Sequence, residues 1–478
     1  MVLLVAAFVM PLISIKRERY VPYIAVAATL MALAMAIPTI PAVLESGMVM
    51  HQMEDWPAPA GITIAVDGIG MVAVMMVSFI GAIVSCFSFR FIKRRKMEYY
   101  SLLCLLLAGL MGIAHTGDIF NMFVFLEIVG LSSYLLTAYY KSTRSIEASI
   151  KFLIIGSFST SMFLLGTLLL YGTTGTLNMA DLAVKLAGIS SPVIPICMGL
   201  LITGLGIKAV IFPFYAWKPD AVSAAPATVG AVLSSASAFI GIFAVMRILF
   251  TVFTGYGQAV YWLFIGLGMV TMLIGSLLAV HQRSLLRLLA YSAISQTGYV
   301  FVALGIGGFV PDGLNAAVFH MINIALIEAL LFLSAGAVIH KTGTDDMSRI
   351  SGMSGISKTL SLCFLVGVLA NAGIPFLNGF ASKWMIYVTA LAVSPLITAF
   401  AAVISVIALM YGVRAYSVVF LGPSEHRRSR LPKSMLLPIV VLAAACIILG
   451  VAPHLGMQLA EFASGSLNNI PYIANVLS

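Results

Sequence analysis

The chain has 478 residues, of which 61% are hydrophobic and 9% are charged, and its formal net charge is +9. Average soluble domains are about 45–50% apolar and about 25% charged, so this composition excludes an ordinary water-soluble fold and indicates that lipid is the solvent. In lipid, every backbone group must be hydrogen-bonded internally, which leaves helices or closed barrels. The apolar runs are continuous rather than alternating, and they predict an all-α polytopic membrane protein.

In chain order, the apolar segments predict about fourteen transmembrane helices in a single membrane domain, residues 1–478. They lie at roughly 2–15, 22–44, 65–89, 100–116, 119–140, 149–171, 192–216, 224–250, 257–280, 288–308, 314–339, 360–393, 396–421 and 435–456. The twelfth segment is long and contains Gly373 and Pro375, so it is either one broken helix or a helix followed by a re-entrant piece.

The basic residues indicate the orientation of the helices. Most Lys and Arg residues fall in the connections that follow the odd-numbered segments, as in the groups at 93–96 and 427–430. Cytoplasmic loops carry such an excess, so we expect both termini outside the membrane. Because the positive charge lies in these loops, it does not indicate nucleic-acid binding. We expect no cleavable signal, because the first segment runs directly into Lys16 and Arg17.

The five cysteines predict no metal or redox centre. They lie far apart inside apolar runs, without the spacing of an iron–sulfur or zinc site, and are interpreted as small apolar residues. They are Cys86, Cys104, Cys197, Cys363 and Cys446. We therefore expect no cofactor and no redox or hydrolytic chemistry in this chain.

Charged side chains inside the apolar segments mark a candidate ion pathway, because a charge at mid-bilayer costs roughly 2.5–3.5 kcal/mol on insertion scales. They are Asp67, Glu127, Lys208, Glu328 and Lys383. For Asp67, capping of a helix is an equally good explanation. Two arginines near segment ends, Arg247 and Arg414, are expected to reach the membrane interface.

Glu127 and Lys208 have the chemistry of a proton-exchange pair. Burial and a neighbouring opposite charge change the proton affinity of both groups, so protonation of one alters the other. The alternative is a static ion pair, although buried pairs stabilise proteins weakly. On the eleventh segment, His320, Asn323 and Glu328 occupy neighbouring helical rows. They predict a polar stripe in which His320 shuttles protons or is simply a hydrogen-bonded core residue.

Proline interrupts both lysine-bearing segments: Pro213 follows Lys208, and Pro375 precedes Lys383. Broken helices at mid-membrane are tolerated where they line a cavity. Segments four to eight and nine to thirteen form two sets of five helices, with the broken segment fourth in each. Five is an odd number, so the second set would be inverted in the membrane, as in inverted-repeat transporters. The approximate repeats are residues 100–250 and 257–421.

Several stretches resemble the antiporter-like subunit family. That family includes Mrp-type cation/proton antiporter subunits, the three large membrane subunits of respiratory complex I, and matching subunits of membrane-bound nickel–iron hydrogenases. The stretches are TGDIFN and the following residues to Glu127, residues 208–217, PDA at 219–221, AP at 225–226, RLLAYSAISQ at 287–296 and LFLSAG at 331–336. The resemblance covers most of the chain, and the TGDIFN motif is closer to the Mrp and hydrogenase branch.

The resemblance implies fourteen helices, inverted five-helix repeats and a central hydrophilic axis. Glu127 and Lys208 match the family's input-side pair, His320 matches a central histidine, and Lys383 matches the charged residue on the second broken helix. The implied function is proton translocation by an antiporter-like subunit of a multi-subunit, energy-converting complex of the membrane-bound hydrogenase type, with other membrane subunits as partners. The alternatives are a component of a Mrp-type Na⁺/H⁺ antiporter, a stand-alone solute transporter, and a structural anchor that conducts no ions.

The sequence departs from the family at two positions. Phe239 stands where the eighth helix often carries a lysine, and Glu328 replaces a lysine on the eleventh helix. One hypothesis is a second acid–base pair between Glu328 and Lys383. The competing hypothesis is that the central relay is interrupted and the chain conducts poorly.

Overall fold

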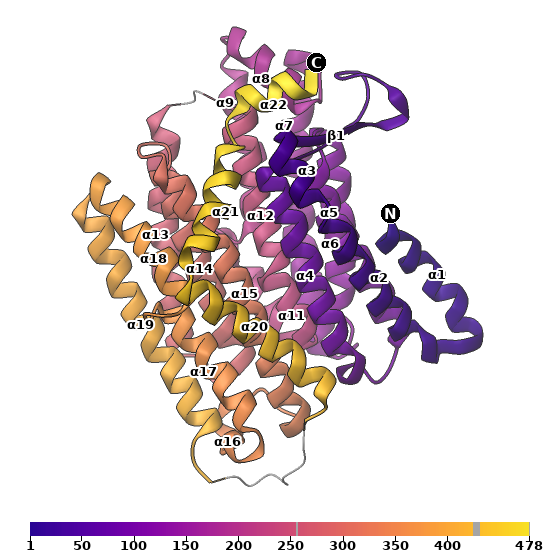
Figure 1. The fold of residues 1–478 in the computed structure, drawn as a ribbon, viewed down its shortest axis with the longest axis vertical. Coiled ribbons are helices and arrows are strands. Elements are labelled where there is room, and N and C mark those ends of the chain that lie inside the picture. Colours follow the sequence, from indigo (N-terminus) through magenta and orange to yellow (C-terminus); the bar gives the residue numbers. More distant parts are fainter. Residues whose placement is uncertain (255–256, 424–430, 478) are drawn as a thin grey trace.

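The computed structural model describes residues 1–254, 257–423 and 431–477, so the basic group expected at 427–430 lies outside the described residues. The described chain is a bundle of long helices (Figure 1). Twelve helical stretches among these residues are long and apolar enough to cross a membrane. The predicted all-α polytopic membrane fold is confirmed, and the count of fourteen helices stays a prediction.

The first part of the chain forms α1 (Val2–Arg17), α2 (Val21–Ala36), α3 (Thr39–Ser46), β1 (Met48–Gln52), β2 (Thr63–Asp67), α4 (Gly68–Phe91), α5 (Lys96–His115), α6 (Ile119–Thr137), α7 (Thr143–Thr174), α8 (Met179–Gly188), α9 (Val193–Ala209) and α10 (Trp217–Ala224). The second part forms α11 (Ala227–Ser234), α12 (Ala236–Arg247), α13 (Gln258–Val280), α14 (Leu285–Ile306), α15 (Asp312–Thr342), α16 (Met353–Ile356), α17 (Lys358–Ala372), α18 (Asn378–Val393), α19 (Pro395–Phe420), α20 (Lys433–Val451), α21 (Pro453–Gly465) and α22 (Asn469–Leu477).

Two apolar segments are interrupted close to their prolines. Helix α9 ends at Ala209, where Val210 takes a left-handed conformation (φ 66°), and the chain resumes as α10 at Trp217. Helix α17 ends at Ala372, Gly373 has a φ of 86°, and α18 begins at Asn378. Proline cannot donate to a helix ladder, and glycine tolerates positive φ at a helix end. Both breaks leave irregular backbone inside the bundle.

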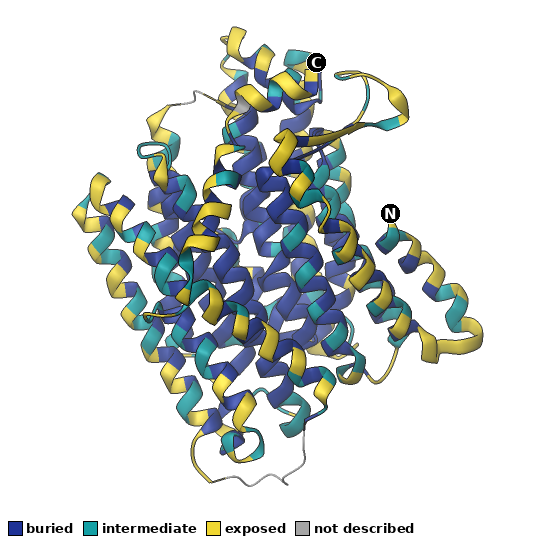
Figure 2. Ribbon diagram, viewed as in Figure 1, coloured by how far each residue is buried: buried dark blue, intermediate teal, exposed yellow. Residues whose placement is uncertain are grey.

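The core lies along α11, α12, α14 and α15, which Figure 2 shows as the dark-blue centre of the bundle. The outer helices instead expose apolar side chains such as Phe8, Leu396 and Val403. This is the arrangement expected when lipid covers the outside of the bundle. Side chains on the central helices are therefore shielded from both water and lipid.

Some elements did not follow from hydropathy. Strands β1 and β2 pair in an antiparallel hairpin, and the last apolar segment continues into α21 and α22. In Figure 1, β1, α8 and α22 lie at the upper end of the bundle and α16 at the lower end. These short elements cover the ends of the long helices.

A buried ion pair joins the start of α4 to the end of α12. Asp67 caps α4 by accepting a 3.0 Å hydrogen bond from the Gly70 amide, which confirms the capping role. Its two oxygens also accept bonds of 2.7 and 2.6 Å from Arg247 at the end of α12. Arg247 is 2% exposed, so the expectation that it reaches the membrane interface was wrong. The Asp67 carboxylate instead neutralises the guanidinium charge inside the protein.

We predict that Arg247→Met destabilises the chain by about 3–5 kcal/mol, because it leaves the Asp67 carboxylate buried without its partner. Thermal unfolding of the purified protein in detergent measures the effect. The control is Arg349→Met, since Arg349 is largely exposed and pairs with Asp346 at 3.4 Å, a type of pair worth about 0–1 kcal/mol. Equal stability of the two variants would contradict the prediction.

Candidate ion-translocation site

The predicted pair of Glu127 and Lys208 comes together at one end of the site. Glu127 lies midway along α6 and Lys208 lies in the last turn of α9, and both are half-buried. The two charges interact electrostatically. The Lys208 ammonium donates a 3.3 Å hydrogen bond to the Tyr134 hydroxyl and lies 5.5 Å from the centre of its ring. Tyr134 therefore holds the lysine that faces Glu127.

Two glycines make room for this tyrosine. A Cβ at Gly156 would lie 1.8 Å from the Tyr134 hydroxyl oxygen, and a Cβ at Gly130 would lie 2.9 Å from the same oxygen and 3.4 Å from the Lys208 nitrogen. Real Cβ atoms do not approach an oxygen as closely as the first of these distances. The position of Tyr134 thus depends on the absence of a side chain at both sites.

We predict that Gly156→Ala forces Tyr134 out of place, costs about 1–3 kcal/mol in stability through overpacking and lowers transport through loss of the Lys208 contact. Gly172→Ala on the same helix is the matched control, because nothing lies within 4 Å of its Cβ position. That change should be neutral or slightly stabilising. Transport in membrane vesicles and thermal unfolding test both variants, and unaltered transport in Gly156→Ala would contradict the proposed contact.

A second acid–base pair, Lys218 and Glu328, lies deep in the bundle. Lys218 is in α10 and Glu328 in α15, with exposures of 0% and 1%. The two groups interact electrostatically. Among the described residues, the Lys218 nitrogen and both Glu328 carboxylate oxygens have no hydrogen-bond partner. Unpartnered buried polar atoms are rare in proteins and call for a functional or solvent-based explanation.

This pair corrects the sequence-based hypothesis. Glu328 was expected to pair with Lys383, whereas its electrostatic partner is Lys218 and Lys383 interacts with His320. Lys218 was missed because it follows an apolar segment that ends near Pro213, and was therefore assigned to a loop. The helix resumes at Trp217 and carries the lysine back inside the bundle. The missed signal was a lysine directly beyond a proline-broken membrane helix.

The polar stripe predicted on α15 faces α18. His320 shares a 2.9 Å hydrogen bond between its Nδ1 and the Ser382 hydroxyl, and its Nε2 has no partner among the described residues. Asn323 and Asn378 bond to each other, with the Asn323 amide donating to the Asn378 carbonyl at 3.0 Å and the Asn378 amide donating to Asn323 at 3.1 Å. One nitrogen of the buried His320 ring thus remains available for a proton.

A hydrogen-bonded route leads from Lys383 toward Glu328. The Lys383 ammonium donates to the main-chain carbonyl of Asn371 at 2.8 Å, and the side-chain amide of Asn371 donates to the Ser292 hydroxyl at 2.7 Å. The Tyr411 hydroxyl donates to Ser292 at 3.0 Å. Tyr411 in turn interacts electrostatically with Glu328. Ser292, Asn371 and Tyr411 were not singled out from the sequence, because serine, asparagine and tyrosine in a membrane helix have many ordinary roles.

Beyond Lys383 the same network continues to α19. The Lys383 ammonium also donates to the Ser405 hydroxyl at 3.3 Å and lies 4.5 Å from the centre of the Tyr299 ring. The Ser405 hydroxyl shares bonds of 2.6 and 2.7 Å with the hydroxyls of Tyr387 and Tyr299. Tyr387 is half-buried, so this part of the network approaches the surface of the bundle.

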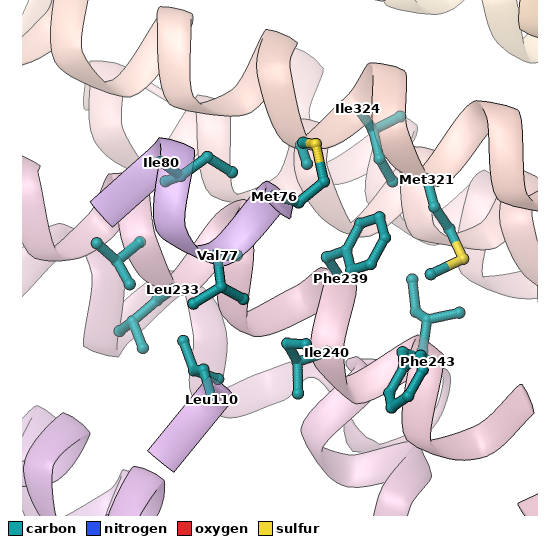
Figure 3. Close-up of a cluster of buried hydrophobic side chains, with 14 of the residues drawn as sticks. Met76, Val77, Ile80, Leu110, Leu233, Phe239, Ile240, Phe243, Met321 and Ile324 are labelled. Carbon is teal, nitrogen blue, oxygen red and sulfur yellow. The ribbon is translucent and has the colours of Figure 1, made fainter. Parts of the chain in front are cut away.

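A buried phenylalanine occupies the position where the family often carries a lysine on the eighth helix. Phe239 on α12 is 2% exposed, and Figure 3 shows it in a cluster of apolar side chains that includes Met76, Met321 and Ile324. Two of these residues come from α15, the helix that carries Glu328. Charge would be costly in such a cluster, so this position holds no ionisable group and is surrounded by apolar side chains.

Aromatic rings separate the first pair from the second. Tyr134 packs edge-on against Phe152 at 4.8 Å, and Phe152 stacks on Trp217 at 4.0 Å with an angle of 2° between the rings. The Trp217 indole donates a 3.1 Å hydrogen bond to the Ile207 carbonyl, across the break between α9 and α10. This aromatic cluster links the two halves of the broken helix and offers few hydrogen-bonding groups between Lys208 and Lys218.

A charged surface cavity of about 190 Å³ lies next to α10. Its lining residues are Arg144, Glu147, Ala148, Lys151, Asp220, Ser223 and Arg287. Asp220 pairs with Arg287 at 2.6 Å and lies 3.8 Å from Lys151. Asp220 lines this cavity from α10, whereas Lys218, two residues earlier on the same helix, is buried inside the bundle.

Comparisons with known proteins agree with this geometry. Residues 116–408 match the family described as NADH:quinone oxidoreductase/Mrp antiporter, transmembrane. The chain is 36% identical to NADH-quinone oxidoreductase subunit N of Desulforudis audaxviator over 84% of both chains. It is 32% identical to the D component of the Na⁺/H⁺ antiporter of Alkalihalophilus pseudofirmus, over 91% of this chain and 90% of that protein.

Among solved structures, a chain of the membrane-bound sulfane sulfur reductase, an archaeal respiratory membrane complex, superposes with a TM-score of 0.94 and 31% identity, covering 100% of this chain and 98% of that one. The expected antiporter-like membrane fold is therefore confirmed. The relatives are subunits of multi-subunit membrane complexes. The chain belongs to the NADH:quinone oxidoreductase/Mrp antiporter family.

Proposed function

We propose that the chain is the proton-translocating, antiporter-like subunit of a multi-subunit, redox-driven complex. The observation that carries this proposal is the series of ionisable groups along the bundle core: Glu127 and Lys208, then Lys218 and Glu328, then Lys383 and His320. Buried ionisable residues in membrane helices are costly and usually belong to proton relays or ion pathways. A purely structural anchor would not need several of them in series.

In this proposal, Glu127 and Lys208 form the input pair, and the Lys218–Glu328 pair is the central relay. Tyr411, Ser292 and Asn371 connect the relay to Lys383, which releases the proton, while His320 exchanges with Lys383. Protonation of one member of an acid–base pair changes the proton affinity of the other. The breaks at Pro213 and Pro375 place the lysines beside irregular backbone, as expected for cavity-lining helices.

The unpartnered polar atoms support a hydrated route. Besides the central pair, the buried atoms without a protein partner among the described residues include His320 Nε2, Ser234 Oγ, Ser334 Oγ and Gln296 Oε1. Buried polar groups of this kind are commonly satisfied by ordered water. Water between these groups would let protons move over distances that side chains do not span.

We also propose that both termini lie outside the plasma membrane of a prokaryote and that residues 100–250 and 257–421 are inverted repeats. In this orientation the charged cavity beside Asp220 opens on the cytoplasmic side, because it lies at the ends of helices that adjoin basic connections.

A second candidate function is that of a component of a Mrp-type Na⁺/H⁺ antiporter. The similarity to the D component of such an antiporter over most of the chain favours it. Both functions use a proton path through this chain. They differ in the driving reaction and in the dependence on Na⁺.

The test is ion transport by the intact complex in sealed vesicles, with native and Lys208→Ala chains, at several Na⁺ concentrations. Loss of pH-gradient formation in the variant, independent of Na⁺, is the expected result. The control is Lys185→Ala, because Lys185 forms a partly exposed ion pair with Asp181 at 3.0 Å. Unchanged transport in Lys208→Ala would overturn the proposal in favour of a structural anchor, and a Na⁺ requirement would favour the Mrp-type function.

A further inference from the structure

A basic cavity outside the proposed pathway lies at one end of the bundle, where α4, α6 and α15 end. Its volume is about 410 Å³. The lining residues are Phe91, Ile92, Lys93, Arg94, Arg95, Tyr139, Tyr140, Ile339 and His340. The cavity therefore combines a cationic edge with an aromatic and aliphatic wall, at the level where membrane helices leave the lipid.

The loop that carries the cationic edge has a defined shape. Arg95 has a positive φ of 47°, which is uncommon for a residue other than glycine. Tyr139 holds the loop at two points: its hydroxyl donates to the Arg94 carbonyl, and its own carbonyl accepts a 3.3 Å bond from the Arg95 guanidinium. Lys93, Arg94 and Arg95 are nevertheless exposed, so their charges are available to a ligand.

Positive charge exceeds negative charge around this cavity. Lys93 and Lys341 both act electrostatically on His340, and the lining contains no carboxylate among the described residues. The nearby Glu98 pairs with Lys141 at 3.7 Å. Three helices end here, each contributing about half a negative charge, which offsets only part of the charge on the three exposed cations. An anion would balance the remainder.

We propose that this cavity binds the phosphate-bearing headgroup of an anionic phospholipid. Basic pockets between transmembrane helices on the cytoplasmic side are suited to such headgroups, and arginine and lysine both pair with phosphate. The apolar wall of Phe91, Ile92 and Ile339 suits the glycerol and the upper acyl chain, which free phosphate lacks. Tyr140, with 52% of its surface exposed, is an aromatic residue typical of the membrane interface.

The experiment uses the intact membrane complex, purified with native or variant chains and exposed in detergent to phosphatidylglycerol, phosphatidylcholine or inorganic phosphate. Native mass spectrometry counts retained lipids and subunits together. The pocket variant carries Lys93→Gln, Arg94→Gln and Arg95→Gln. We expect the native complex to retain phosphatidylglycerol in preference to phosphatidylcholine. The pocket variant should bind phosphatidylglycerol about a hundredfold more weakly, because each of the three basic residues contributes about fivefold to the affinity.

The control variant carries Lys16→Gln, Arg17→Gln and Arg19→Gln, three exposed basic residues in the connection between α1 and α2. It removes the same charge outside the cavity and should bind phosphatidylglycerol within about twofold of the native complex. Equal loss in both variants would overturn the proposal in favour of general surface charge. Displacement of the lipid by millimolar inorganic phosphate would assign the site to a soluble anion instead.

Loss of a neighbouring protein chain from the pocket variant, with phosphatidylglycerol binding unchanged, would likewise overturn the lipid site, because the cationic edge would then contact another protein of the complex. A milder variant, Arg94→Gln alone, is expected to weaken lipid retention severalfold while the complex stays assembled. The proposal rests on the proposed membrane orientation but not on the proton pathway, since none of the cavity residues belongs to that pathway.

Discussion

Lys218→Met is expected to abolish proton transport and to destabilise the chain by up to about 3–5 kcal/mol, the cost of leaving a buried charge without its opposite charge. Lys218 and Glu328 are fully buried, and among the described residues their charged atoms have no hydrogen-bond partner. Each group is the charged neighbour that acts electrostatically on the other. Without Lys218, Glu328 remains as a lone buried carboxyl that holds its proton and cannot relay it.

The double variant Lys218→Met with Glu328→Met separates stability from function. Apolar residues of similar volume often replace a buried ion pair with neutral or favourable stability, so thermal unfolding should return close to the native value. Transport should stay lost, because no ionisable group remains at the relay. Lys185→Met is the control, since its pair with Asp181 is partly exposed. Native-like pH-gradient formation by the double variant would refute a central relay at this position.

The two hypotheses about the departures from the family can be compared with the structure. A relay interrupted at Phe239 was one expectation, and Phe239 does lie in an apolar cluster. Lys218, on the preceding broken segment, nevertheless brings a positive charge to Glu328. The centre of the bundle therefore still holds an acid and a base, with the carboxylate on α15 and the lysine on α10.

Hydropathy predicted the membrane fold, because long continuous apolar runs form helices in lipid. It also identified most of the buried charged groups, because a charged residue is easily recognised inside such a run. Glu127, Lys208 and Lys383 were found in this way. Lys218 was not, because the fold of a segment after a helix break depends on tertiary packing. The stacking of Trp217 on Phe152 holds α10 inside the bundle, and nothing in the local sequence specifies that contact.

Pairings were harder to predict than positions. Glu328 and Lys383 are both buried, but the sequence contains no distances, and the choice of partner depends on how α10, α15 and α18 pack. The ion pair of Asp67 with Arg247 was missed for the same reason: the two residues are 180 positions apart. Hydrogen bonds between polar side chains, such as that of Asn371 with Ser292, likewise cannot be predicted until the packing of the helices is known.

The environment of Lys383 differs from that of Lys218 in one decisive respect. The Lys383 ammonium is held by the Asn371 carbonyl, the Ser405 hydroxyl and the face of Tyr299, all of which are neutral. The Asn371 carbonyl also accepts a 3.2 Å bond from Gln296, so it keeps a partner when the lysine is removed. Loss of Lys383 therefore leaves no buried charge unbalanced.

Lys383→Met should accordingly abolish proton release while destabilising the chain much less than Lys218→Met does, by about 1–2 kcal/mol for the lost hydrogen bonds. Thermal unfolding and pH-gradient formation by the intact complex measure the two effects, with Lys358→Met on the exposed start of α17 as the control. Transport that survives in Lys383→Met but fails in Lys218→Met would show that protons leave the central pair by another route. Loss in both variants, with the difference in stability, would mean that both lysines carry protons and that only Lys218 also balances a buried carboxylate.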